Sequence, residues 1–242
     1  MVACKRDLIM SEYLSKIVNC ITKIENEEGE RLNAVSHLVA DTIKNDGLIF
    51  TFGCGHSHLP GLDAFYRAGG LANVSPMLDT DLMLHNGAAK SSRMEKMSGI
   101  ASEVFRRYTP SAKDMIFIFS ASGKNQVPIE MAQMAKNAGV KSVGISAWSY
   151  IEKGGKLHEN VDIAIDCKVP YGDACMDVGD IKMGGLSTYA ACFILNSCLI
   201  NGAKLALKDG VKPPVYISGN VEGGREHNIT LENLFMGRVK HL

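Results

Sequence analysis

Two short segments of the sequence share a layout: each follows an apolar run, contains glycine and ends in a residue of the type that caps helices. They are Gly53-Cys54-Gly55-His56-Ser57 and Ser120-Ala121-Ser122-Gly123-Lys124-Asn125. A proline lies three residues beyond the last member of each segment, where it fits the first turn of a helix, because its missing N–H would have no intrahelical partner. A glycine marks the end of the amphipathic segment that follows, at Gly69 and at Gly139. The sequence therefore predicts two strand-to-helix turns that are built alike.

Turns of this kind can bind an anion. The first turn of a helix leaves backbone N–H groups free, its dipole favours negative charge, and glycines let the backbone approach a ligand closely. In open parallel sheets the ligand crevice lies at the carboxyl ends of the strands. The segment from Ser120 to Gly123 is the stronger candidate, because helix capping requires only one hydroxyl side chain. For either turn alone, ordinary capping by Ser57 or Asn125 explains the pattern equally well.

Other kinds of site fit these residues less well. Gly53-Cys54-Gly55 lacks the third glycine of a dinucleotide fingerprint, and Gly123-Lys124 is followed by Asn, without the earlier glycine of a P-loop. His56 and His58, together with His85 and Asp79, are an alternative metal-site pattern. Two points argue against a metal site. His58 would fall within the first turn of a helix rather than at a strand end beside His56. Five strands also cannot form the barrel that usually carries a His-x-His motif. We therefore expect no metal and no cofactor.

The elements that would position these turns follow from the spacing of the apolar residues. Short continuous apolar runs predict strands that helices cover on both faces, and amphipathic segments between them predict helices. This alternation indicates an α/β fold, a three-layer α-β-α sandwich around a five-stranded parallel sheet. The predicted strands are 48–52, 71–78, 115–119, 142–146 and 161–165, and the predicted helices are about 57–69, 88–108, 125–139 and 180–208.

The two ends of the chain differ from this alternating middle. Apolar residues at helical spacing over 7–45, with Gly29 between two sets, predict a helical hairpin. Beyond Lys212, two prolines and a polar, glycine-rich stretch precede a short periodic end, which predicts a loop and a terminal helix. We therefore divide the chain into a hairpin over 1–46 that packs on the same domain, an α/β core over 47–211, and a loop and helix over 212–242.

The composition of the chain limits the kinds of molecule that this protein could bind. The 242 residues carry 26 Lys and Arg against 26 Asp and Glu, which leaves no basic field for nucleic acid. The N-terminus is charged where a signal peptide would be apolar, and the apolar run over 190–200 is short and contains Asn196, so we expect no membrane segment. The seven cysteines form no C-x-x-C pair and are odd in number, as expected for reduced thiols of a cytoplasmic protein.

With the helical hairpin in front and five parallel strands around them, the two turns resemble the SIS (sugar isomerase) domain, which binds phosphosugars. The segment GNVEGGREHN, over 219–228, is similar to that of an uncharacterised bacterial subfamily of phosphosugar isomerases. The resemblance implies that Ser120, Ser122 and Asn125, with N–H groups near Ala121 and Gly123, hold the phosphate. It also implies that the first turn contacts the substrate. The residues are Gly53, Cys54, Gly55, His56 and Ser57, and the last three would lie along the sugar. The family usually has Ser or Thr where this chain has Asn125, whose amide can still donate to a phosphate.

The resemblance also implies catalytic residues. Aldose–ketose isomerisation needs a general base and a group that moves hydroxyl protons. Glu95 lies where SIS isomerases and related etherases carry a catalytic Glu, with Glu103 as the fallback, and a solvated helix face is the alternative explanation. His227 resembles a C-terminal histidine that assists ring opening, often from a partner subunit, and a surface-loop histidine is the alternative. Further candidates are His85, Asp79 and Asp81 after the second strand, and Lys182, Ser187 and Thr188 at the start of the last long helix, where Ser187 or Thr188 could simply cap.

We therefore expect a cytoplasmic homodimer or higher homo-oligomer that isomerises a small sugar phosphate between aldose and ketose without a cofactor. Neither nucleic acid nor membrane is an expected partner. One alternative is an etherase or lyase that eliminates a 3-O-linked lactate from an amino-sugar phosphate, since both reactions begin with loss of a proton from C2. The other alternative is a protein that senses a phosphosugar without catalysis.

Overall fold

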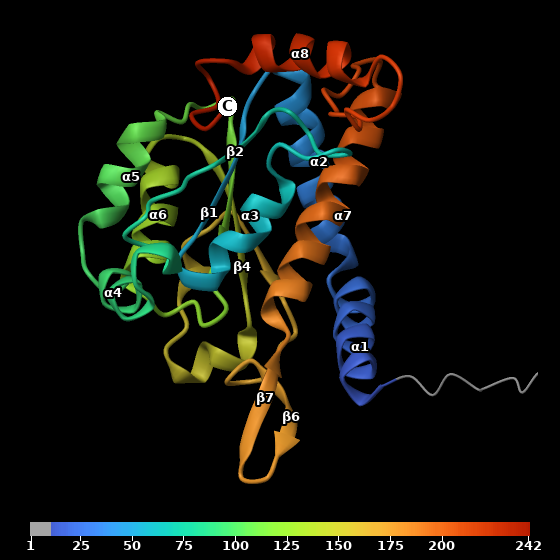
Figure 1. The fold of residues 1–242 in the computed structure, drawn as a ribbon. Coiled ribbons are helices and arrows are strands. Elements are labelled where there is room, and N and C mark those ends of the chain that lie inside the picture. Colours follow the sequence, from blue (N-terminus) through green and yellow to red (C-terminus); the bar gives the residue numbers. More distant parts are fainter. Residues whose placement is uncertain (1–10) are drawn as a thin grey trace, which may run out of the picture.

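The computed structural model describes residues 11–242, and a parallel five-stranded sheet lies at its centre (Figure 1). The strand order is β2-β1-β3-β4-β5. The strands are β1 (Ile49–Gly53), β2 (Val74–Pro76), β3 (Met115–Phe119), β4 (Lys141–Ser146) and β5 (Ile163–Asp166). β1 and β3 are neighbours, paired from Ile49 with Met115 to Gly53 with Phe119, so their carboxyl ends are level. The predicted three-layer α/β fold is confirmed.

Both faces of the sheet are buried, as the continuous apolar runs predict. Alternate residues of β3 point to opposite sides: Phe117 and Phe119 pack with α2 (Gly29–Lys44) and α7 (Ser187–Lys208). Ile116 and Ile118 pack with α5 (Ile100–Tyr108) and α6 (Gln126–Asn137) on the other side. α7 is long and apolar enough to span a membrane by length and composition. It packs along α2 and contributes eight residues to the buried interior, as a core helix does.

The predicted N-terminal hairpin is wrong, although both of its helices exist. α1 (Glu12–Glu27) and α2 are separated only by Glu28, whose N–H donates to the Ile24 carbonyl at 2.9 Å. The Glu28 carbonyl accepts from the Leu32 N–H at 2.9 Å, so helical hydrogen bonding continues across the break. The two helices therefore follow one another as a bent rod beside α7 (Figure 1). Residues 7–10 of the predicted hairpin lie outside the described residues.

The predicted helix over 88–108 is interrupted. α4 (Ala88–Met94) ends at Glu95, and α5 begins after Gly99, which has a left-handed φ of 89°. This break places Glu95 at the end of a short helix rather than inside a long one. The predicted helix over 57–69 is shorter, with a 3-10 turn at Gly55–His58 followed by α3 (Leu59–Ala64). Further 3-10 turns are Leu84–Asn86, Trp148–Lys153 and Leu157–Glu159.

The predicted helix start at residue 180 is also wrong. An antiparallel hairpin of β6 (Ala174–Val178) and β7 (Ile181–Gly185) precedes α7 and projects from the body (Figure 1). The Tyr13 hydroxyl of α1 donates to the Gly185 carbonyl at 3.0 Å and holds the base of this hairpin. Beyond α7, a loop leads to α8 (Gly224–Phe235), in line with the predicted terminal loop and helix. The boundaries of the three proposed segments stay a prediction.

Candidate functional site

The two predicted turns lie side by side because β1 and β3 are adjacent and end at the same level. A narrow pocket opens between them at the carboxyl edge of the sheet. Several predicted site residues line it together, namely His56, Ser57, Ser120, Ala121, Ser187 and Thr188, with Pro60, Phe119, Ile145, Cys167 and Ala191 completing the wall. The sequence pattern thus identified residues from three segments that the fold brings to one place.

The glycines of the first turn are required by its geometry. A Cβ on Gly53 would lie 2.1 Å from the Ser57 carbonyl oxygen, and Gly55 has a left-handed φ of 55°. His58 is buried with its Nδ1 against the Gly55 carbonyl, whereas His56 is exposed at the pocket. Burial lowers the pKa of His58. The first turn therefore presents His56 and Ser57 to the pocket and keeps His58 inside.

The second turn is fixed by its own backbone. Gly123, at a φ of 59°, donates its N–H to the Ser120 carbonyl at 3.0 Å and to Ser120 Oγ at 3.2 Å. The N–H near Gly123 is thus used within the turn, contrary to the expectation that it binds the phosphate. Among the residues that the structure describes, no hydrogen-bond partner is found for the N–H groups of Ala121, Ser122, Asn125 and Gln126. These groups are the donors that remain for an anion.

Glu95 lies against both turns. Its backbone carbonyl accepts from the Val127 N–H at 3.1 Å, at the N-terminus of α6. Its side chain is half-buried, and its charge adds to the effect of burial in raising the pKa of the Cys54 thiol of the first turn. Burial raises the pKa of Glu95, and the Asn125 amide opposes that rise. A carboxylate with a raised pKa beside a turn with unpartnered N–H groups is suited to exchange protons with a ligand.

Comparison with known proteins agrees with this geometry. A family model described as the SIS domain matches residues 12–147. The chain belongs to the SIS domain family. A UPF0309 protein of Thermoanaerobacter pseudethanolicus is 38% identical over 97% of this chain and 100% of its own length. A UPF0309 protein of Caldanaerobacter subterraneus is 39% identical over 95% of this chain and 98% of its own length.

Solved structures share the fold of this SIS domain. A phosphoheptose isomerase from Neisseria gonorrhoeae superimposes with a TM-score of 0.52 at 16% identity, over 78% of this chain and 94% of that one. A phosphoheptose isomerase from Francisella tularensis gives a TM-score of 0.52 at 13% identity over the same shares of the two chains. The predicted resemblance to the SIS family is confirmed.

Glu95, Ser122 and Asn125 are not part of the pocket wall in this SIS domain, and Lys182, Glu103 and His227 do not line it either. Lys182 is on β7, exposed and paired with Asp177 at 2.5 Å, because the hairpin replaces the predicted helix start. Glu103 is exposed on α5 and paired with Arg106 at 3.1 Å. His227 is in the first turn of α8, not in a loop, and its Nε2 lies 2.9 Å from the Val215 carbonyl. Figure 1 shows α8 over the amino ends of the strands, so His227 does not reach the pocket of its own chain.

The residues after β2 form a turn of their own beside the SIS pocket. Asp79 accepts the Asp81 N–H at 2.9 Å, and Asp81 pairs with Lys90 at 2.5 Å. His85 is exposed, and its ring lies 5.6 Å from that of His58. Within residues 11–242, no group of three or more His, Cys, Asp or Glu side chains is placed to hold a metal ion.

Asp173 is a site residue that the sequence pattern did not reveal. Its Oδ1 accepts the N–H groups of Leu186 at 3.0 Å and Ser187 at 2.8 Å, and its Oδ2 accepts the Ser187 hydroxyl at 2.7 Å. A carboxylate from a distant loop thus occupies the N-terminus of α7. The capping explanation of Ser187 is wrong, because Ser187 donates its hydroxyl to Asp173 and makes no capping hydrogen bond, and the N-cap residue is Leu186. Asp173 takes the N–H groups of Leu186 and Ser187 at this helix end. Thr188 remains on the pocket wall.

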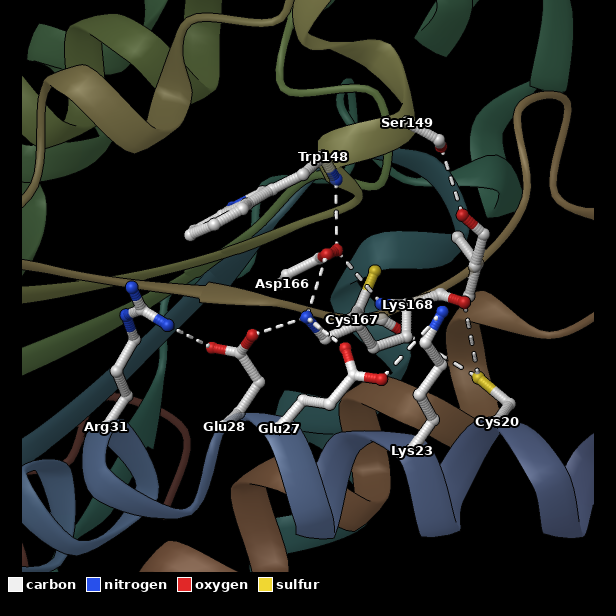
Figure 2. A network of polar contacts seen from close by, with 11 residues as sticks. Cys20, Lys23, Glu27, Glu28, Arg31, Trp148, Ser149, Asp166, Cys167 and Lys168 are labelled. Carbon is white, nitrogen blue, oxygen red and sulfur yellow. Dashed lines mark hydrogen bonds and ion pairs between the residues drawn. The ribbon is translucent and has the colours of Figure 1, made fainter.

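The pocket wall at Cys167 is backed by a buried charge cluster (Figure 2). The Lys168 ammonium lies 2.6 Å from Glu28, 3.2 Å from Glu27 and 3.2 Å from Asp166. Only 1% of the Glu28 side chain and 10% of the Lys168 side chain are exposed. Burial alone lowers the pKa of Lys168, but hydrogen bonds to Glu28 and Glu27 and the charge of Asp166 hold it above its ordinary value. The ammonium therefore stays charged and joins the α1–α2 break to the end of β5.

Asp166 extends this cluster to the second turn. Its Oδ1 accepts the N–H groups of Trp148 and Lys168, both at 3.0 Å (Figure 2). Ala147, the residue before Trp148, donates its N–H to the Ala121 carbonyl at 2.9 Å. A continuous path of contacts therefore runs from the N-terminal helices to the second turn. Sequence reasoning missed this path because its members are far apart in the chain and form no local motif.

Proposed function

We propose that this SIS-domain protein binds a small sugar phosphate at the carboxyl edge of its sheet and isomerises it between aldose and ketose without a cofactor. The observation that carries the proposal is the position of Glu95, a half-buried carboxylate against the N-terminus of α6 and the first turn. The shared fold of the phosphoheptose isomerases supports a reaction of this class. The curated relatives are named only as UPF0309 proteins and add no reaction.

In this proposal the second turn holds the phosphate. The N–H groups of Ser122, Asn125 and Gln126 and the Ser122 hydroxyl donate to its oxygens, and the dipole of α6 favours its charge. Because the chain has no net charge, local hydrogen-bond donors of this kind must provide the attraction for the negatively charged phosphate. His56 and Ser57 of the first turn lie along the sugar.

Glu95 is the base in the proposed reaction. The carboxylate takes the proton from C2 of the open-chain aldose, and the C2–H electron pair forms the double bond of an enediol as the carbonyl oxygen on C1 accepts a proton. Return of the proton to C1, with loss of the O2 proton, gives the ketose. No electron is gained or lost overall, so no redox partner is needed. The raised pKa of Glu95 brings it closer to the ideal range of a general base.

A ligand screen tests the binding step. We expect one or more phosphorylated sugars to raise the melting temperature, and the same sugars without phosphate to leave it unchanged. A ligand at 100 times its Kd stabilises the folded state by roughly 2.7 kcal/mol, which such a screen detects easily. Stabilisation by neutral sugars alone would contradict the proposal.

Substitution of Ser122 by alanine tests the phosphate turn. We expect sugar phosphate binding to weaken by about 1.5–3 kcal/mol, the usual contribution of a hydrogen bond to a charged group. Calorimetric titration of wild type and variant measures this difference. Ser102→Ala on α5, whose hydroxyl donates to the Gly99 carbonyl at 2.8 Å, is the control and should bind as wild type does. An unchanged Kd in Ser122→Ala would contradict the proposal that the phosphate binds at this turn.

We infer that the protein assembles as a homodimer through the groove between α1, α2 and α7. Apolar side chains of α7 and α1 are exposed there, including Ile200 at 52%. The groove is lined by Ile21, Thr22, Glu25, Asn26, Gly29, Leu32, Asn33, Phe193, Ser197, Ile200 and Asn201. Apart from Glu25 these residues are uncharged. Their amides and hydroxyls can both donate and accept hydrogen bonds. The surface can therefore pack against the same surface of a second copy across a twofold axis.

Ile200→Asp tests this assembly. A buried, unpaired carboxylate at the interface should shift the protein to a monomer in analytical ultracentrifugation. Val221→Asp is the matched control, because Val221 is equally exposed, at 52%, in the loop before α8. A wild-type protein that sediments as a monomer, or an Ile200→Asp variant that stays dimeric, would contradict this interface.

A further inference from the structure

α7 carries a ridge of apolar side chains along its outer face. Phe193, Ile200 and Leu207 follow one another at seven-residue intervals, so they lie on one side of the helix. Ile200 is 52% exposed and Leu207 is 59% exposed. A helix that packs only on its own sheet would carry polar side chains on its outer face. The ridge therefore has the character of an interaction surface.

Grooves run along both sides of this ridge. The first groove, between α1, α2 and α7, contains Phe193 and Ile200. A second groove, of about 290 Å³, lies between α7, α3 and the segment 213–215, and Ile200 and Leu207 line it. Ile200 thus belongs to the wall of both grooves. A surface that carries a ridge beside grooves can pack against its own copy, because the ridges of one helix fit the grooves of another.

Each groove contains one charged side chain, and the two charges are opposite. Glu25 of α1 lines the first groove, and Lys204 of α7 lines the second. Both side chains are exposed, and within residues 11–242 neither forms an ion pair. One charge of each sign on an otherwise uncharged surface is complementary to a second copy of that surface. The charges therefore favour a second copy of this chain as the occupant of both grooves.

Glu25 is level with the N-terminal half of α7. α1 and α2 run beside α7 in the same direction (Figure 1). The Tyr13 hydroxyl of α1 donates to the Gly185 carbonyl, just before α7, at 3.0 Å. Cys198 Sγ, in the middle of α7, lies 3.8 Å from the Leu32 carbonyl oxygen of α2. Because Glu25 lies between Tyr13 and Leu32 along the chain, it falls beside the part of α7 that precedes Cys198.

Lys204 lies one helical turn beyond Ile200, in the C-terminal half of α7 and in the other groove. Ile200 therefore separates Lys204 from Glu25 both across α7 and along it. A twofold axis that passes Ile200 and runs between the two charges exchanges their positions. The Glu25 carboxylate of one copy then faces the ammonium of the partner subunit's Lys204, and the same contact occurs twice in the dimer.

We propose that two copies of this chain pack α7 against α7 across a twofold axis at Ile200, and that Glu25 of each copy pairs with the partner subunit's Lys204. The inference rests on the homodimer proposed for the first groove, and it adds the second groove and the residues that meet. The ridge side chains of one copy enter the grooves of the other. The intermolecular ion pairs fix the angle at which the two helices cross.

Charge reversal tests this arrangement. Glu25→Lys and Lys204→Glu each place like charges opposite one another twice in the dimer, so each should raise the dimer Kd by about 100-fold or more in sedimentation equilibrium. Lys136→Glu, on α6 at the other face of the sheet, is the control and should dimerise as wild type does. All three side chains are exposed, so the variants should melt at the temperature of the wild type.

A mixture of the two single variants tests the contact between copies directly. In a heterodimer of Glu25→Lys with Lys204→Glu, both facing pairs carry opposite charges again, so native mass spectrometry should detect this heterodimer where neither variant dimerises alone. The double variant Glu25→Lys/Lys204→Glu should dimerise by itself for the same reason. No ligand is needed, so the outcome is independent of the proposed reaction.

Two results would overturn the arrangement while the dimer itself stands. One is a wild-type dimer that either single variant leaves equally tight. The other is a mixture of the two variants that stays monomeric. A wild-type protein that sediments as a monomer would overturn both the arrangement and the dimer.

Discussion

Replacing Glu95 with glutamine should lower the turnover of the sugar phosphate by roughly 10²–10⁴-fold, the usual contribution of a general base. Glutamine has the same shape and leaves the backbone contact of residue 95 with Val127 in place, but its amide cannot accept a proton at neutral pH. Binding should therefore change little, so that the loss appears in kcat rather than in Kd. Steady-state kinetics together with calorimetric titration measure both quantities.

Glu103→Gln is the matched control for this prediction. Both glutamates belong to the segment that the sequence pattern identified. Glu103 is exposed and pairs with Arg106 at 3.1 Å, whereas Glu95 is half-buried and contacts the N-terminus of α6 through its backbone carbonyl. Its substitution should leave kcat unchanged. An unchanged kcat in Glu95→Gln, or an equal loss in Glu103→Gln, would remove Glu95 from the mechanism.

The pH dependence of the wild type follows from the same residue. Glu95 must be charged to take a proton, and burial raises its pKa from the ordinary value of 4.5. Activity should therefore fall as the pH falls through this raised pKa, at a higher pH than for an exposed glutamate. A rate that stays constant down to pH 4.5 would contradict a base in this environment.

Lys168→Met should destabilise the fold by about 3–5 kcal/mol, since it removes one partner of a buried ion pair and leaves the other charge behind. The Glu28 carboxylate is only 1% exposed and would keep a single cationic partner, Arg31 at 2.9 Å. Urea unfolding at neutral pH measures the change in the free energy of unfolding. In wild type the folded-state pKa of Lys168 is raised, so this stabilisation is present below the ordinary value of 10.5 and is lost only as the pH rises through the folded pKa.

Lys182→Met is the matched control for Lys168→Met. Lys182 also lies close to a carboxylate, at 2.5 Å from Asp177, but 57% of its side chain is exposed. Exposed ion pairs are screened by water, so this variant should unfold nearly as wild type does. Adding Glu28→Gln to Lys168→Met should recover part of the lost stability, because it removes a buried carboxylate charge that has lost its ammonium partner and keeps only Arg31. Equal effects of the two lysine substitutions would contradict the importance of the buried cluster.

The sheet and its two turns can be predicted from the sequence because their causes are local. Continuous apolar runs such as that of β3 indicate strands covered on both faces, and the glycine, hydroxyl and proline order marks the turns. Parallel topology then brings the turns to one edge. For these reasons the sequence pattern correctly predicts that Ser57, Ser120 and Ala121 lie together.

The remaining features depend on long-range contacts or on the conformation of single residues. Gly29 lies where the apolar spacing predicts a reversal of the chain, yet hydrogen bonds of Glu28 continue the helix past it. Gly99 breaks the predicted long helix because it adopts a left-handed φ and is held by Glu130. Asp173 and Lys168 act on partners far away in the sequence, so no local pattern could reveal them.

Proton NMR of candidate aldose phosphates in deuterated water tests the central claim most directly. With the wild-type protein we expect one of them to be converted to its ketose, with solvent deuterium appearing on the carbon that receives the proton. With Glu95→Gln, which should still bind the same compound, neither conversion nor deuterium incorporation should be detected. A sugar phosphate that binds in the pocket and is returned by the wild type with every carbon-bound proton intact would contradict the proposed isomerase function.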